Sequence, residues 1–174
     1  QGWHWIDIDP FGSPVPFLDT AVQALARRGV LEISATDSAA LSGSSKNPLM
    51  RRYGARVRLD KMKHDSGLRV LIATVARAAA RHDRSIEPLL SIWDSHHLRV
   101  SVSVRRVMTG ANDVEESLGW RVYTPNQAEV DASVAAGLLP ADNGSDLPIR
   151  CFLPLSHPLY LSVSTPLSLA LTAS

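Results

Sequence analysis

The sequence has 174 residues, of which 45% are apolar and 20% are charged, with a formal net charge of +1. These totals are typical of a globular chain with one domain and room for part of a second. The near-neutral charge excludes a chain that is basic overall, so any nucleic-acid surface must be a local basic patch. The lone Cys151 excludes an internal disulfide and a cysteine-based zinc site, which fits a cytoplasmic protein. No apolar stretch is long enough to span a bilayer, so we expect no membrane association.

The first segment predicts a β-α-β unit. Trp3 to Ile8 is short, apolar and partly β-branched, which predicts a strand ending at Asp9-Pro10-Phe11-Gly12. Apolar residues then recur at helical spacing between a capping Ser13 and a terminating Gly29. Val30 to Thr36 predicts the second strand. Because a helix joins the two strands, they should run parallel.

A loop and two further helices are predicted next. Asp37 to Asn47 is small and polar, which is typical of a mobile loop. Pro48 to Tyr53 predicts a short helix closed by Gly54. A long helix should follow from about Gly67 to His82, because its apolar residues recur on one face.

The next two apolar segments predict a β-hairpin. Ile86 to Trp93 and Leu98 to Val107 are joined by a short polar connection, so the strands should pair antiparallel. Polar and apolar residues alternate from Arg99 to Arg105, which indicates a strand with one buried face and one solvent-exposed face. Later in the chain the pattern weakens, although Gly119 to Tyr123 predicts a strand. The order of elements is that of an α/β fold.

The turn after the first strand is the main candidate site, because open α/β sheets bind ligands at the carboxyl ends of their strands. Asp9 can accept hydrogen bonds from an exocyclic amine, and Phe11 can stack on a base, worth about 1–3 kcal/mol. Pro10 and Gly12 give the backbone its stiffness and its tight turn. These groups suit methyl transfer to an amine, which depends on placing the nitrogen about 3–3.5 Å from the methyl. On these residues alone, a simple turn after a strand is the alternative.

Ordered blocks covering about residues 5–107 resemble the tRNA (guanine-26-N2) dimethyltransferases, and the resemblance is weak beyond them. The matching blocks are Ile6–Pro14, Gly29–Leu31, Ala35–Leu41, Arg52–Ala55, His64 with Gly67–Arg69, Ala76–Ser91 and Asp94–Arg105.

This resemblance implies a fold and a reaction. Residues 1–108 would form the later half of a Rossmann-like class I methyltransferase sheet, and residues 109–174 a linker and a partial, atypical second domain. S-adenosylmethionine would be the donor and tRNA the substrate, with two methylations of one guanine amine. Asp9 would hold the amine and Phe11 would stack on the guanine, within a catalytic loop that includes Pro10 and Gly12. The base must leave the tRNA fold to reach this loop.

Two further sets of residues are candidates for substrate contacts. The first set could line the base pocket, although structural roles are the alternative: Thr36, Asp37, Tyr53 and His64. The second set could contact tRNA phosphates, although a solvated basic helix face is the alternative: Arg69, Arg77, Arg81 and Arg84. We expect His96 and His97 in solvent on the hairpin turn, and we expect no metal site.

The glycine-rich turn that holds the donor in such folds is absent from this sequence. We therefore expect the main donor-binding residues upstream of Gln1, and we expect the 174-residue chain alone to bind the donor poorly and not to catalyse. Two alternatives stay open. One is another methyltransferase with an Asp-Pro-aromatic loop, acting on DNA adenine or another RNA; the other is a non-catalytic RNA-binding remnant.

Overall fold

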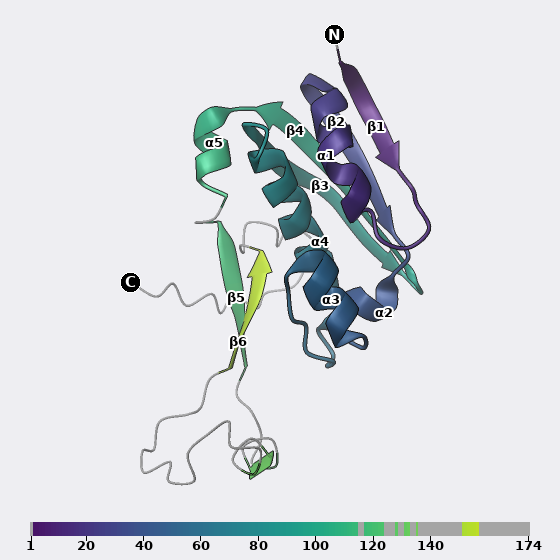
Figure 1. Ribbon diagram of the computed structural model, residues 1–174, viewed down its shortest axis with the longest axis vertical. Helices are drawn as coiled ribbons and strands as arrows, with labels where there is room; N and C mark the ends of the chain where they lie inside the picture. Colours follow the sequence, from purple (N-terminus) through teal and green to yellow (C-terminus); the bar gives the residue numbers. More distant parts are fainter. Residues whose placement is uncertain are drawn as a thin grey trace.

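The computed structural model describes residues 2–114, 117–123, 128, 131–132, 135 and 151–156. Its main body is a four-stranded mixed sheet whose strands are β1 (Trp3–Ile8), β2 (Leu25–Ala35), β3 (Arg84–Asp94) and β4 (His97–Arg106). Their spatial order is β1-β2-β4-β3 (Figure 1). A second, two-stranded antiparallel sheet pairs β5 (Leu118–Tyr123) with β6 (Cys151–Ser156). The chain thus has the α/β class that the sequence predicted.

The expected β-α-β unit is confirmed, because β1 and β2 pair in parallel. The predicted end of its helix is wrong: α1 (Val15–Ala24) stops before Leu25, and the chain passes directly into β2. Arg84 explains the early stop, since its guanidinium donates hydrogen bonds of 2.7 Å to the backbone carbonyls of both Leu25 and Ala26. Leu25 itself is buried in the core. These bonds satisfy the two carbonyls outside the helix, where the chain continues as β2.

The loop predicted for Asp37 to Asn47 is partly helical. A short helix, α2 (Ser38–Leu41), occupies its start because Ala40 and Leu41 are buried against the core. The predicted short helix is confirmed as α3 (Lys46–Tyr53). Gly54 closes it with φ of +61° and donates its backbone N–H to the carbonyl of Met50 at 3.0 Å.

The long helix is confirmed as α4 (Lys63–Ala80), which begins a little over one turn before the predicted start. The early start places Asp65 inside the first turn, where the helix dipole favours a negative charge. Asp65 also accepts a 2.7 Å hydrogen bond from Arg69 one turn later. Gly67 lets this end of the helix pass very close to α2, since a Cβ there would lie 2.6 Å from the carbonyl oxygen of Leu41.

The hairpin of β3 and β4 is confirmed in its antiparallel register, with Asp94 opposite His97. A short helix not predicted from the sequence, α5 (Met108–Asn112), follows it. Of residues 109–174, most lie outside the described residues, so the proposed boundary after residue 108 stays a prediction.

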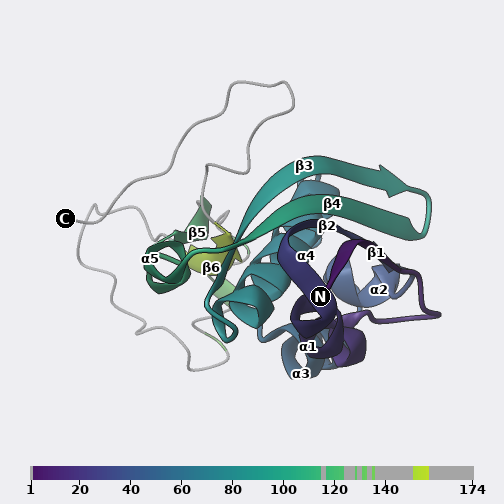
Figure 2. The same ribbon diagram turned by 90° about the horizontal axis from the view of Figure 1, so that it is seen from above.

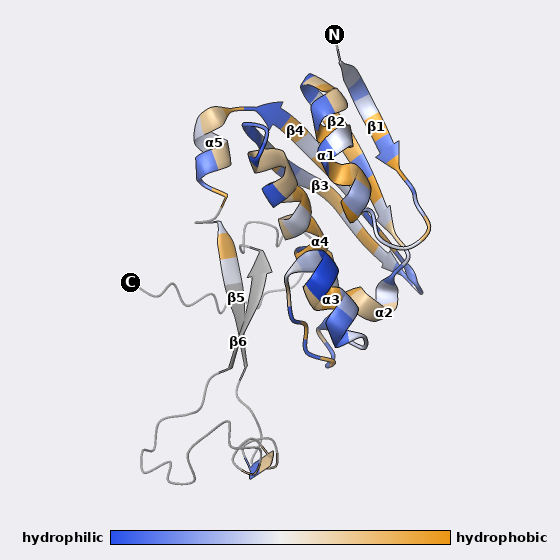
Figure 3. Cartoon of the chain, in the orientation of Figure 1, coloured by the Kyte–Doolittle hydropathy of each residue, from blue (hydrophilic) through white to orange (hydrophobic). Residues whose placement is uncertain are grey.

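The core lies between the sheet and helices α1 to α4, which all lie on one face of the sheet (Figure 2). Leu31, Ile33, Val100 and Val102 point into this core and are completely buried. Hydrophobic and hydrophilic residues alternate along these strands, as Figure 3 shows. No described helix covers the other face, where Arg99 donates 2.8 Å hydrogen bonds to Asp7 and Ser34. The bond to Asp7 is the main cause that raises the pKa of Arg99.

Candidate active site

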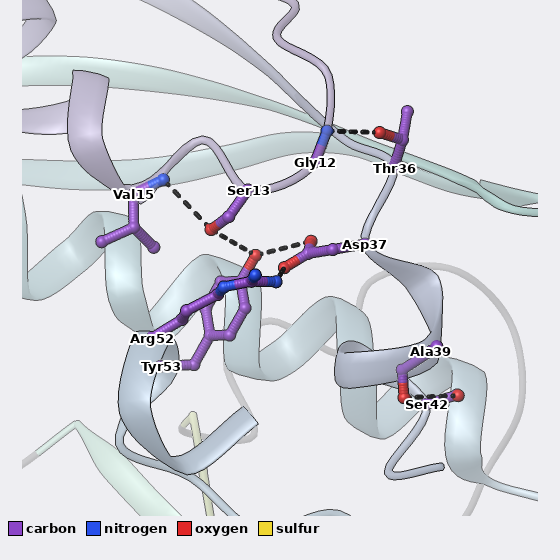
Figure 4. Close-up of polar contacts among 9 residues, drawn as sticks. All are labelled: Gly12, Ser13, Val15, Thr36, Asp37, Ala39, Ser42, Arg52 and Tyr53. Atoms are coloured by element: carbon purple, nitrogen blue, oxygen red, sulfur yellow. Dashed lines mark hydrogen bonds and ion pairs between the residues drawn. The ribbon is translucent and has the colours of Figure 1, made fainter. Parts of the chain in front are cut away.

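The loop after β1 is clamped to the end of β2. Gly12 donates its backbone N–H to Thr36 Oγ1 at 2.6 Å, and Thr36 donates its own N–H to the carbonyl of Gly12 at 2.9 Å (Figure 4). Gly12 has φ of +86°, a conformation that side chains disfavour. The parallel pairing of β1 and β2 places their carboxyl ends side by side, so the residues that follow each strand can bond directly to one another.

Hydrogen bonds among four polar side chains join the same loop to the end of β2 and to α3. Ser13 Oγ donates to Tyr53 Oη at 2.9 Å, and Tyr53 Oη donates to Asp37 Oδ1 at 2.8 Å. Arg52 Nη1 donates to Asp37 Oδ2 at 3.0 Å (Figure 4). We call Ser13, Asp37, Arg52 and Tyr53 the support network.

Tyr53 is a fixed hydrogen-bond donor within this network. Its side chain is buried, with 4% of the residue exposed. Burial raises the pKa of the phenol far above its ordinary value, and the nearby Asp37 carboxylate raises it further. The hydroxyl therefore stays neutral and cannot serve as a general base. Its position lets it join the loop to α3.

Asp9 and Phe11 project from the clamped loop into solvent. The side chain of Asp9 is 66% exposed, and Phe11 is fully exposed. A carboxylate that can accept hydrogen bonds and a free aromatic face are thus presented together by a rigid backbone. A carboxylate can accept hydrogen bonds from an amine, and an aromatic ring can stack on a flat base.

His97, at the start of β4, lies beside this loop. Its Nε2 is 3.9 Å from Asp9 Oδ1, although the sequence indicated only a solvent-exposed turn. The antiparallel pairing of β4 with β2 sets this approach, because it makes β4 begin at the same end of the sheet where β1 and β2 end. Sequence reasoning missed Arg52 and His97 as neighbours of the loop, although both lie within blocks that carry the resemblance.

The candidate pocket residues fall into two groups. Thr36, Asp37 and Tyr53 converge on the loop, where the polar groups of all three are hydrogen-bonded within the protein. His64 does not join them, because its ring stacks on Trp93 with the ring centroids 4.3 Å apart. Direct substrate contact by any of these residues stays a prediction.

The candidate phosphate-binding arginines each have a partner within the protein. Arg69 and Arg84 are buried, and their guanidinium groups bind Asp65 and two backbone carbonyls respectively. Arg81 Nη2 donates to Asp19 Oδ1 at 3.1 Å, and Arg77 is also engaged. These partners give the four side chains structural roles, and phosphate contact stays a prediction.

Within the described residues, no helix is long and apolar enough to cross a membrane. The same residues contain no group of three or more His, Cys, Asp or Glu side chains that could hold a metal ion.

The fold defines a methyltransferase-like α/β chain. It is similar to the structure of Trm1 from Pyrococcus horikoshii in complex with S-adenosyl-L-methionine, with a TM-score of 0.67 and 37% sequence identity. The match covers 70% of this chain and 33% of that one. The family of N2,N2-dimethylguanosine tRNA methyltransferases matches residues 1–136, and the chain belongs to this family.

Curated relatives agree with this assignment. The tRNA (guanine(26)-N(2))-dimethyltransferase of Thermoplasma volcanium is 47% identical over 118 residues, which are 68% of this chain and 34% of that protein. The enzyme of the same name from Thermococcus kodakarensis is 36% identical over 147 residues, which are 84% of this chain and 38% of that protein. The chain thus spans about a third of the length of the curated relatives it matches.

Proposed function

We propose that the protein dimethylates the exocyclic N2 amine of guanine 26 in tRNA, in the cytoplasm, with S-adenosylmethionine as the methyl donor. The observation that carries this proposal is the exposed pair Asp9 and Phe11 on a loop fixed at the carboxyl end of the sheet, in a chain of this family. The named relatives act on this position of tRNA, and the solved neighbour was determined with this donor.

The architecture supports a finer assignment of the fold. Residues 1–108 form the later half of a Rossmann-like class I methyltransferase domain, and residues 109–174 form a linker with part of a second domain. Two parallel strands followed by an antiparallel hairpin, in the order β1-β2-β4-β3, support the first part of this assignment.

The acceptor side of the reaction follows from the loop. Phe11 stacks on the guanine, and the Asp9 carboxylate accepts hydrogen bonds from its amino group, which fixes the direction of the nitrogen lone pair. As the nitrogen gains a methyl group it must lose one proton, and Asp9 is placed to accept it. The exposed Asp9 carboxyl can then release that proton to solvent between the two methylations, since His97 Nε2 at 3.9 Å is beyond hydrogen-bond distance.

The donor side is not assigned to residues of this chain. In the family, S-adenosylmethionine supplies an electrophilic methyl group. The 174 residues contain no glycine-rich turn of the kind expected to hold it, so the residues present fit the acceptor and not the donor. What this chain contributes is a rigid platform that selects and orients the amine.

The decisive experiment measures methyl transfer from labelled donor to tRNA by wild type and the Asp9→Ala variant of a full-length protein that carries this chain together with its donor-binding residues, because we expect the 174 residues alone not to catalyse. Loss of a group that orients and deprotonates the amine should lower kcat by about 10²–10⁴-fold. Asp19→Asn is the matched control, because it removes an exposed carboxylate on α1 that forms an ion pair with Arg81. Wild-type kcat in Asp9→Ala would refute the proposal. Tight tRNA binding by wild type without any transfer would favour the RNA-binding alternative.

A further inference from the structure

A cluster of arginines lies at the end of the sheet opposite the Asp9 loop. β1 and β2 start at this end and β4 finishes there, as Figure 1 shows. Arg27 and Arg28 come from the first residues of β2, and Arg106 from the last residue of β4. We call these three exposed residues the basic patch. They come from segments far apart in sequence, so the sequence alone did not group them.

The basic patch surrounds two hollows on the protein surface. One has a volume of about 590 Å³ and is lined by Arg27, Arg84 and Arg106, together with residues at the start of α5. The other has a volume of about 680 Å³, shares Arg27 and Arg106, and adds His4 and Arg28. Arg27 and Arg106 line both hollows, so the two hollows adjoin the same two guanidinium groups.

Buried Arg84 holds the backbone that carries this patch. The pairing of β2 with β1 slips here: Leu25 lies opposite Trp3, whereas Val30 already lies opposite Trp5. The intervening residues of β2 therefore bulge away from β1. Arg84 binds the carbonyls of Leu25 and Ala26 at 2.7 Å each, which fixes the bulge immediately before Arg27 and Arg28.

The charges of the basic patch are not balanced within the described part of the protein. No described acidic side chain forms an ion pair with Arg27, Arg28 or Arg106, whereas the neighbouring Arg105 is paired with Glu87 at 2.8 Å. Burial, and then the positive charge of Arg106, lowers the pKa of Arg84. Guanidinium groups that surround a hollow without acidic partners are suited to an anionic ligand, because phosphate oxygens match their planar donor geometry.

We propose that the basic patch binds phosphates of an RNA backbone, remote from the loop that carries Asp9. RNA is favoured over an acidic protein or a lipid surface because the chain belongs to a family of tRNA methyltransferases, and because guanidinium groups match the planar geometry of phosphate oxygens. That this RNA is tRNA rests on the proposed function. The patch would then hold the substrate at one end of the sheet while the target base reaches the other.

The test measures tRNA affinity of the protein at several salt concentrations for wild type and the Arg27→Ala/Arg106→Ala double variant. The double variant should bind on the order of tenfold more weakly, and its slope of log K against log salt should be smaller by about 0.7–0.9 for each phosphate that the variant no longer binds. Arg106→Lys keeps the charge and should keep the slope. Arg58→Ala is the matched control, because this arginine lies outside the basic patch and is already paired with Asp60 at 3.8 Å.

The two proposals fail in different ways. Substitutions in the basic patch should raise KM for tRNA and leave kcat at saturating tRNA unchanged, whereas Asp9→Ala should lower kcat with little change in tRNA affinity. Unchanged affinity and salt slope in the double variant would overturn the patch proposal, whether or not transfer is observed. An equal loss in Arg58→Ala would also overturn it. Binding of RNA-free anionic vesicles through the basic patch, with tRNA binding unaffected by the double variant, would overturn it as well.

Discussion

Replacing Tyr53 with Phe tests whether the support network holds the loop that carries Asp9 and Phe11. The substitution keeps the buried ring and removes only the hydroxyl, which accepts a hydrogen bond from Ser13 and donates one to Asp37. A hydrogen bond to a charged group contributes about 1.5–3 kcal/mol and a neutral one about 0.5–1.5 kcal/mol. Asp37 keeps its ion pair with Arg52 in the variant, so its carboxylate is not left without a partner and the loss stays at the lower end of the summed range. We expect the free energy of unfolding to fall by about 2–3 kcal/mol.

For a chain of this size, that loss corresponds to a decrease in Tm of about 4–12 °C. Urea unfolding followed by circular dichroism measures the free energy of unfolding. The single-turnover rate of methyl transfer measures whether the loop still positions the amine. Ser13→Ala alone should cost about 1 kcal/mol, and a double-mutant cycle with Tyr53→Phe should give a coupling of similar size. If Tyr53→Phe unfolds within about 0.5 kcal/mol of wild type, the network does not support the loop and the reasoning is wrong.

Three further changes test other parts of the structure. Thr36→Val removes the acceptor for the Gly12 amide at nearly constant volume and should lower kcat more than Thr36→Ser does, as measured by single-turnover transfer. Gly67→Ala forces a methyl group against the carbonyl of Leu41 and should cost about 1–2 kcal/mol in urea unfolding, despite the better helix propensity of alanine; an unchanged midpoint would contradict the close approach. The hydrogen bond from Arg81 is the first cause that lowers the pKa of Asp19, and the hydrogen bond from His82 is the second. The ionised carboxylate therefore stabilises the fold at pH values above its unfolded pKa of 3.8, and this stability is lost as the pH falls through the lower pKa of the folded state. The stability difference between wild type and Asp19→Asn should therefore be under about 1 kcal/mol at neutral pH and should narrow in acid; a gap that widens there would contradict the ion pair.

The strands were predictable because their patterns depend on local features. The period-two alternation of Val100, Val102 and Val104 identifies a strand with one buried face, and the short polar connection after Trp93 sets the antiparallel pairing. The end of α1 was not predictable in this way. It depends on Arg84, which is distant in sequence and binds the carbonyls of residues that the local pattern assigned to a helix.

The candidate site was predicted in part. The motif from Asp9 to Gly12 was correctly expected to follow a strand, because Pro and Gly end a strand and the residues before them are apolar. The residues that hold the loop were predicted only as residues lining a base pocket, and their hydrogen bonds to the loop were not predicted. The bond from Ser13 to Tyr53 joins residues 40 positions apart, and no periodicity in the sequence encodes that distance. The approach of His97 to Asp9 depends on the sheet order β1-β2-β4-β3 in the same way.

The clamp of Gly12 on Thr36 and the bond from Ser13 to Tyr53 make the loop a product of long-range folding. A short peptide with the sequence of residues 9–14 would have neither anchor and should sample many shapes. Grafting the loop onto another scaffold would therefore require the strand end with Thr36 and the helix with Tyr53 to be carried along. The smallest unit that can be transferred is therefore the loop, the end of β2 and α3, held in their present arrangement. The proposed chemistry belongs only to side chains of the loop.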